Sequence, residues 1–256
     1  MAQPEIHQFP CLKDNYGVLV HDPDRNVTLS IDAPDADAVG HALAERGWRL
    51  THILATHHHA DHTAGIPALK AETQCKIIGP KAEAARIPGL DLVIAEPDAL
   101  MLGGLAIAVI DTPGHTIGHV AYWIPEAKVA FVGDTLFAMG CGRVLEGTAE
   151  MMWASLEKLA RLPPDTAIYC GHEYTVSNGK FGVTIEPENT RLAERLAEAE
   201  AARAAGQPTL PTRIDLELET NVFLRADRED VRAHVGLPVA PTWKVFANLR
   251  ERKNRF

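Results

Sequence analysis

The stretch THHHADH, residues 56–62, places four histidines and one aspartate within seven positions. In an extended segment, residues two apart point to the same side of the chain. His57 and His59 can therefore bind one cation, whereas the histidine between them points elsewhere. Asp61 and His62 follow where the chain turns into a helix, and their different directions suit a second cation beside the first. Imidazole and carboxylate ligands without cysteine favour zinc, iron or manganese.

Two metal ions need more ligands than this stretch supplies. Ligand-type residues also follow three other expected strands, in the segments TPGHTIGH, GDTLF and GHEYT. Loops at strand ends are where sites are usually built, so His115, Asp134 and His172 are candidates for completing the site. Asp134 is the only carboxylate among these three residues, and we expect it to bridge the two metals.

The alternative to a metal site differs from residue to residue. A single histidine such as His115 is more often an ordinary surface or hydrogen-bonded residue. The HxHxDH run is different, because two histidines and an Asp-His pair within six positions are difficult to satisfy with hydrogen bonds alone. We expect His58 and His119 to be non-ligands.

The segments that must position these residues alternate between short apolar runs and helical patterns, which is typical of an α/β fold. A hairpin is expected where the turn-rich DPDRN separates two strand patterns. Strands are expected at residues 16–21, 27–33, 50–55, 76–78, 105–110, 120–124, 129–132 and 166–170. Helices are expected at residues 35–47, 63–73 and 150–161.

The pattern changes after about residue 175, and the rest of the chain is expected to be mostly helical. Helices are expected at residues 187–205, 227–234 and 242–254. The sequence therefore predicts two domains, residues 1–174 with the ligand-type residues and a smaller helical domain at residues 175–256.

Composition restricts the class of partner and the location. The net charge of −9 and the sequence pI near 5.7 argue against broad nucleic-acid binding, which needs a basic surface. No apolar run reaches the roughly 18 residues of a membrane span, and the first residues have no signal-peptide character. The four cysteines are widely spaced and predict free thiols in a reducing compartment. We therefore expect a cytoplasmic protein, acting as a monomer on a small molecule, with no membrane or nucleic-acid partner.

The motif His57-x-His59-x-Asp61-His62 resembles the signature of the metallo-β-lactamase superfamily. Four further segments, LKDNYGVLV, GDTLFAMGCGRVLEGT, YCGHEYTVSNGKF and NLRERKNRF, are similar to the glyoxalase II (hydroxyacylglutathione hydrolase) family. The resemblance runs nearly from end to end. It implies an αβ/βα four-layer sandwich with a two-metal site at one edge and a C-terminal helical, substrate-binding domain.

Carried over residue by residue, the resemblance implies two divalent ions that share Asp134. The ligands of the first ion are His57, His59, His115 and Asp134, and those of the second are Asp61, His62, His172 and Asp134. The two aspartates are the implied catalytic residues, since they hold and charge-balance the metals. Zinc is the expected metal, with iron or manganese as alternatives.

The family's glutathione site corresponds to Arg143, Tyr174, Arg250 and Lys253. Arg143 stands where a lysine is more usual, and Leu145 stands where the family often has a tyrosine. The last 16 residues also carry five basic side chains against one acid. Such a patch could bind the carboxylates of glutathione, or it could complement the end of a helix dipole.

The implied reaction is hydrolysis of S-D-lactoylglutathione and other S-2-hydroxyacylglutathiones to glutathione and a 2-hydroxy acid such as D-lactate. This is the second step of methylglyoxal detoxification. As a hypothesis, a hydroxide that bridges the metals attacks the thioester carbonyl. The thiolate then leaves with little help, because thiols have pKa values near ~8.5.

Two other functions are compatible with the metal motif. A persulfide dioxygenase of the same fold resembles the motif set, but it uses one iron and generally lacks the long helical C-terminal domain. A non-catalytic protein could use the metals structurally, but structural zinc sites are usually closed and rich in cysteine. A thioester hydrolase is therefore the preferred interpretation of the sequence.

Overall fold

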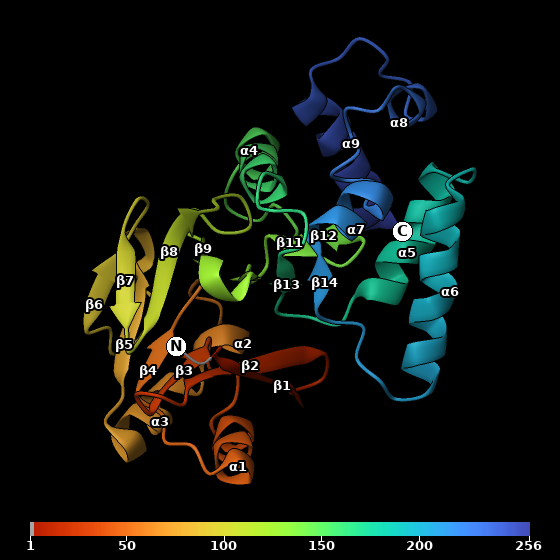
Figure 1. Ribbon diagram of the computed structural model, residues 1–256. Helices are drawn as coiled ribbons and strands as arrows, with labels where there is room; N and C mark the ends of the chain where they lie inside the picture. The colour runs from red at the N-terminus through yellow and green to blue at the C-terminus, as the bar shows by residue number, and fades with distance from the viewer. Residues whose placement is uncertain (1–2) are drawn as a thin grey trace. The chain divides into compact units, whose positions relative to one another are not determined.

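The computed structural model describes residues 3–256, which divide into two compact units (Figure 1). Unit 1 comprises the chain up to Asp111 together with Ile117–Gly133, and unit 2 comprises Thr112–Thr116 and Asp134–Phe256. Each unit combines strands with helices, and the expected α/β class is confirmed. The expected domain boundary after residue 174 does not coincide with these units and stays a prediction.

Unit 1 contains a six-stranded mixed sheet in the order β1-β2-β3-β4-β5-β6. Its strands are β1 (Glu5–Cys11), β2 (Asn15–Asp22), β3 (Val27–Ile31), β4 (His52–Leu54), β5 (Lys76–Pro80) and β6 (Leu92–Ile94). β1, β2 and β3 are antiparallel, so the expected hairpin is confirmed, whereas β3 to β6 are parallel. The carboxyl ends of β3, β4 and β5 therefore lie at the same edge of the sheet.

The same unit contains an antiparallel meander. Its strands are β7 (Ala99–Leu102), β8 (Leu105–Asp111), β9 (Val120–Ile124) and β10 (Val129–Phe131). A short 3₁₀ helix, η2 (Pro125–Ala127), connects β9 to β10. The expected strands in this region are thus confirmed, and β7 is an addition that the sequence pattern did not reveal.

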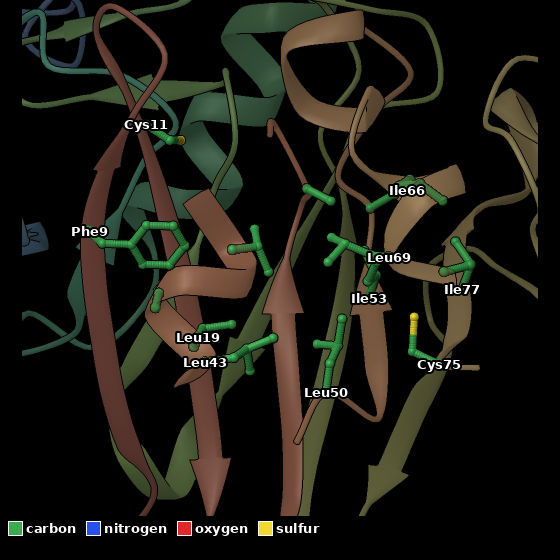
Figure 2. Close-up of a cluster of buried hydrophobic side chains, with 14 of the residues drawn as sticks. Phe9, Cys11, Leu19, Leu43, Leu50, Ile53, Ile66, Leu69, Cys75 and Ile77 are labelled. Atoms are coloured by element: carbon green, nitrogen blue, oxygen red, sulfur yellow. The ribbon is translucent and has the colours of Figure 1, made fainter. Parts of the chain in front are cut away.

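The main core of unit 1 lies between the six-stranded sheet and the helices α1 (Ala36–Arg46) and α3 (Ile66–Thr73). Figure 2 shows Leu43 of α1 and Leu69 of α3 among the apolar side chains of the strands, including Leu19 and Ile53. Leu19 and Ile53 are completely buried. Burying a side chain of this size stabilises the fold by roughly 1.5–3 kcal/mol, so this cluster holds the strands that carry the ligand-type residues.

The helix expected at residues 63–73 is wrong at its start, because α3 begins only at Ile66 and a separate short helix, α2 (Ala60–Thr63), precedes it. Two neighbouring residues cause the break. The backbone N–H of Gly65 donates to Ala33 at 2.9 Å instead of continuing the helical ladder. Pro67, at the start of α3, has no N–H to donate, so the helix restarts there.

Unit 2 contains two small antiparallel pairs and six helices among its described residues. The strands are β11 (Leu136–Phe137), β12 (Gly140–Cys141), β13 (Ala167–Tyr169) and β14 (Thr212–Arg213), and the helices are α4 (Ala149–Ala160), α5 (Thr175–Ile185), α6 (Thr190–Ala204), α7 (Ile214–Thr220), α8 (Glu229–His234) and α9 (Thr242–Arg255). The mostly helical C-terminal region is confirmed. None of the helices in residues 3–256 has the length and apolar character needed to cross a membrane.

Helix α5 was not expected from the sequence, because its residues TVSNGKFGVTI include two glycines and several β-branched residues. It packs against α6, which runs beside it in Figure 1. At Gly179 an added Cβ would lie 2.9 Å from Leu196 of α6, and at Gly182 it would lie 3.1 Å from Leu192. The glycines that lower helix propensity thus allow α6 to approach closely.

Gly40 within α1 and Gly47, the cap residue directly after it, allow a matched test of this helix. A Cβ added at Gly40 or Gly47 meets no atom within 4 Å, but Gly47 has φ +67° and Gly40 does not have a positive φ. We expect Gly40→Ala to raise the free energy of unfolding by about 0.5–1 kcal/mol. Gly47→Ala should lower it by about 1–2 kcal/mol, since the residue must stay left-handed. Urea unfolding of both variants checks this, and two changes of the same sign would contradict it.

Candidate metal and substrate site

Three consecutive parallel strands of unit 1 end in polar side chains at one edge of the sheet. Asp32 follows β3 directly, residues 56–62 follow β4, and the 3₁₀ helix η1 (Lys81–Glu83) follows β5. Backbone hydrogen bonds continue the ladder up to these positions, as Asp32 N–H donates to Leu54 at 2.9 Å. The edge outside the carboxyl ends of parallel strands is the usual place for a ligand site in such sheets.

Asp32 determines which nitrogen of His57 and His62 carries a proton. The carboxylate, 5% exposed, accepts from the backbone N–H of Thr56 at 2.7 Å, from the Thr56 hydroxyl at 2.9 Å and from His62 Nδ1 at 2.7 Å. Because the Thr56 hydroxyl donates to Asp32, its oxygen accepts from His57 Nδ1 at 3.0 Å. In both neutral imidazoles the proton is on Nδ1, which leaves the Nε2 lone pair for a ligand.

These Nε2 atoms face other potential ligands. His57 Nε2 lies 3.0 Å from His59 Nδ1, and His62 Nε2 lies 3.9 Å from Asp61 Oδ2. Asn15 holds Asp61 by donating to its backbone oxygen at 3.1 Å and to Oδ2 at 3.4 Å. The expected pairing of His57 with His59, and of Asp61 with His62, is thus present within unit 1.

Unit 2 brings the other three candidate ligands together. His115 Nε2 and His172 Nε2 both lie 3.4 Å from Asp134 Oδ2, and all three side chains are buried. His115 Nδ1 lies 2.8 Å from the backbone oxygen of Arg143. A carbonyl oxygen only accepts, so in the neutral imidazole the proton is on Nδ1 and the lone pair of Nε2 faces the carboxylate. Asp134 Oδ2 thus lies between two imidazole nitrogens, and its role as a ligand shared by two ions stays a prediction.

An imidazole lone pair that faces a carboxylate oxygen is repelled by it unless a proton or a metal ion lies between the two atoms. The imidazole and carboxylate groups of both clusters therefore fit divalent metal ions in their chemistry. Cysteine takes no part in this set. All four cysteines are buried free thiols, and burial raises their pKa values, that of Cys141 to about 11 and that of Cys11 to about 12.

The four expected substrate-binding residues lie in unit 2 and differ in environment. The guanidinium of Arg143 is exposed and makes no hydrogen bond or ion pair with other residues in the range 3–256. The ring of Tyr174, 37% exposed, stacks on His172 with centroids 4.8 Å apart and planes at 2°. Leu145, where the family often has a tyrosine, is also exposed.

Arg250 and Lys253 both make hydrogen bonds to other residues of unit 2. Arg250 is only 7% exposed, donates from Nη1 to the backbone oxygen of Cys141 at 2.8 Å, and lies over the ring of Phe223. Lys253 Nζ donates to the backbone oxygen and hydroxyl of Ser177 at 2.8 Å. Burial, and secondly the charge of Arg250, lower the pKa of Lys253 to about 8.

Sequence reasoning missed the residues that hold the ligands rather than bind a metal. Asp32, Asn15 and Glu83 belong to this group. Asp32 carries the one usable signal, because it follows a strand just as the ligand-type residues do. Asn15 and Glu83 stand alone in the sequence, without a spacing partner that would reveal their contacts.

Two family models together match nearly the whole chain. Residues 22–172 match the family model of the metallo-beta-lactamase superfamily, and residues 173–256 match that of the hydroxyacylglutathione hydrolase C-terminus. The chain is 54% identical over 252 residues to a protein named hydroxyacylglutathione hydrolase from Brucella anthropi, with 98% of this chain and 97% of that protein covered. A protein of the same name from Brucella ovis is 52% identical with 98% of each chain covered.

Two solved structures extend the comparison to the fold. The BLEG-1 B3 metallo-beta-lactamase has a TM-score of 0.66 at 22% identity, and covers 86% of this chain and 99% of its own. TTHA1623, solved in a di-iron-bound form, has a TM-score of 0.57 at 25% identity, and covers 65% of this chain and 91% of its own. The chain therefore belongs to the metallo-β-lactamase superfamily and, within it, to the hydroxyacylglutathione hydrolase family. The expected superfamily fold with a C-terminal helical domain is confirmed.

The environment of Lys253 gives a measurable prediction. Reductive ¹³C-methylation followed by NMR should show one lysine, Lys253, that titrates near pH 8. Arg250→Met removes the neighbouring positive charge, so the pKa of Lys253 should increase in that variant. A titration of Lys253 near pH 10 in the unaltered protein would contradict the burial described above.

Proposed function

We propose that this protein is a metal-dependent thioester hydrolase that cleaves S-D-lactoylglutathione and related S-2-hydroxyacylglutathiones to glutathione and a 2-hydroxy acid. The observation that carries the proposal is the end-to-end likeness to hydroxyacylglutathione hydrolases, together with the two clusters of facing imidazole and carboxylate groups. Both the metal-ligand residues and the residues expected to bind glutathione are present in the chain.

The proposed metal content is two divalent ions. His57, His59, His115 and Asp134 would hold the first, and Asp61, His62, His172 and Asp134 would hold the second. Two observations support a shared Asp134: its Oδ2 is equidistant from two imidazole nitrogens, and TTHA1623 was solved in a di-iron-bound form. Zinc suits the donor set, with iron or manganese as alternatives.

When bound, such a pair of ions supplies a water of lowered pKa as nucleophile and polarises the thioester carbonyl. The protein's own residues prepare for this chemistry. Asp32 and the backbone oxygen of Arg143 keep the imidazoles of His62 and His115 in the tautomer whose Nε2 can act as ligand. Asp61 and Asp134 supply negative charge, and the departing thiolate needs little protonation because its pKa is near ~8.5.

The C-terminal part of unit 2 is the proposed substrate-binding region, with residues 1–174 as the proposed catalytic domain. Arg143 and Lys253 offer cationic groups for the two carboxylates of glutathione, and Tyr174, which is 37% exposed, is the third proposed contact. Arg250 supports this region by holding the backbone at Cys141 and by adding positive charge near Lys253. A monomeric state, a cytoplasmic location and the lack of nucleic-acid and membrane partners remain predictions.

The alternative functions are not favoured. A persulfide dioxygenase is not expected to carry the C-terminal segment that matches the hydroxyacylglutathione hydrolase model at residues 173–256. A purely structural metal site is usually closed by cysteines, and all four cysteines here are buried with raised pKa values. Hydrolysis of S-D-lactoylglutathione by purified protein, with bound metal counted on the same sample, tests the proposal. A fully metallated sample without turnover would refute it.

Asp134→Ala tests the shared ligand. Removing a carboxylate that serves both ions should reduce metal content and activity together, with a loss of metal affinity above the roughly 10–100-fold expected for residues that only support ligands. Asp165→Ala, an exposed aspartate of the same unit, is the control and should keep both properties. An Asp134→Ala protein that retains two ions and its activity would rule out the bridging role.

Lys253→Met tests the proposed substrate contact. Loss of one charge-assisted hydrogen bond should raise KM about tenfold at pH 7, with a smaller change in kcat. In the unaltered enzyme KM should increase as the pH rises through about 8, because Lys253 then loses its charge, and the variant should lack this dependence. Lys244→Met, an exposed lysine on the same helix, is the control. A defect confined to kcat would argue against substrate binding by Lys253.

A further inference from the structure

Glu83, at the end of η1, is a buried carboxylate with three hydrogen-bond donors. It is 2% exposed. Its Oε2 accepts from the backbone N–H of His58 at 2.7 Å and from His58 Nδ1 at 2.7 Å. Its Oε1 accepts from the backbone N–H of Gly118 at 3.0 Å. A carboxylate buried to this degree is stable only when such donors surround it, so the contacts define one orientation.

His58 is the residue between the expected ligands His57 and His59. Residues 57–59 form neither strand nor helix, so no backbone ladder orients this segment. Glu83 binds the backbone N–H and the ring of the middle residue, and the Thr63 hydroxyl donates to the backbone oxygens of His58 at 3.2 Å and His59 at 3.0 Å. The side chains on either side of His58 face each other, with His57 Nε2 3.0 Å from His59 Nδ1.

An independent observation concerns Gly118. A Cβ added at this position would lie 2.5 Å from Glu83 Cγ and 2.7 Å from Ala82 Cβ. The backbone of the loop before β9 therefore reaches the carboxylate only because residue 118 has no side chain. The same loop carries His119, whose ring stacks on His57 with centroids 4.9 Å apart. The Glu83 carboxylate thus binds both segments next to the imidazole of His57, namely residues 57–59 and the loop that contains Gly118 and His119.

We propose that Glu83 is a positioning residue of the metal site, which holds His57 and His59 in their binding directions by acting through His58. The inference rests on the proposed function, since it assumes that these two histidines bind a metal. Preorganised ligands pay less conformational entropy on binding, so Glu83 raises the affinity for the ion that His57 and His59 share. His58 itself does not bind the ion.

The test is titration of the metal-free protein with Co²⁺, followed by d–d absorption and by competition with a chelator. In Glu83→Gln the amide keeps the shape of the side chain, but its NH₂ group must face one of the three donors. We expect the Co²⁺ affinity to fall about 10–100-fold. Glu186→Gln is the matched control, because Glu186 is also buried and paired, with Arg225, and should keep the affinity while losing some thermal stability.

Two variants of His58 separate positioning from general stability. Asn at position 58 can still donate to Glu83 from its amide, whereas Leu cannot. His58→Asn should therefore bind Co²⁺ nearly as the unaltered protein does, and His58→Leu should resemble Glu83→Gln. These variants also serve if Glu83→Gln does not fold. Equal affinities of His58→Leu and His58→Asn would overturn the inference, as would unaltered affinity in folded Glu83→Gln.

The same titration distinguishes failure of the proposed metal-dependent function from failure of the positioning role of Glu83. If the unaltered metal-free protein binds no Co²⁺, the proposed metal-dependent function falls and the inference falls with it. If the unaltered protein binds Co²⁺ and Glu83→Gln binds it equally well, the positioning role alone is refuted.

Discussion

The arrangement of unit 1 depends on one buried carboxylate, that of Asp32. It accepts three hydrogen bonds and so fixes the proton of His62 directly and that of His57 through the Thr56 hydroxyl. Without this acceptor either imidazole could place its proton on Nε2, where it would oppose a metal ion. Asp32 itself has φ +57°, a conformation that aspartate tolerates better than most residues. In this left-handed conformation the carboxylate of Asp32 reaches Thr56 and His62 in the loop that follows β4.

The parallel part of the sheet explains why such supporting residues come from distant parts of the sequence. β3, β4 and β5 run in the same direction, so the chain leaves each of them at the same edge. These strands are followed in turn by Asp32, by the histidine-rich residues 56–62 and by η1, which ends at Glu83. The helices of the crossovers, α1 and α3, pack against the apolar side chains shown in Figure 2. This close packing fixes the strands, and therefore also the positions of the polar residues at their ends.

The sequence allowed prediction of most strands and of the candidate ligands, because both depend on spacing. HxHxDH needs only the period of an extended chain followed by a turn. Features that depend on contacts between distant segments escaped prediction. Gly65 leaves the helical ladder for Ala33, α5 is helical despite Gly179 and Gly182 because α6 packs against it, and Glu83 has no local pattern at all. What the sequence cannot express is which solitary polar residue the fold places beside a ligand.

Arg250 and Lys253 of unit 2 have different environments, and we expect them to have different roles. Arg250 donates from Nη1 to the backbone oxygen of Cys141, so one side of its guanidinium is already occupied within the protein. Lys253 is half-buried near the charge of Arg250, so protonation costs it more than it costs an exposed lysine. A ligand carboxylate that binds beside both groups would offset this cost and raise the pKa of Lys253. Binding of an anion above about pH 8 would therefore be accompanied by uptake of a proton at Lys253. The charge of Lys253, which is unfavourable beside Arg250 in the empty region, would then stabilise the bound anion.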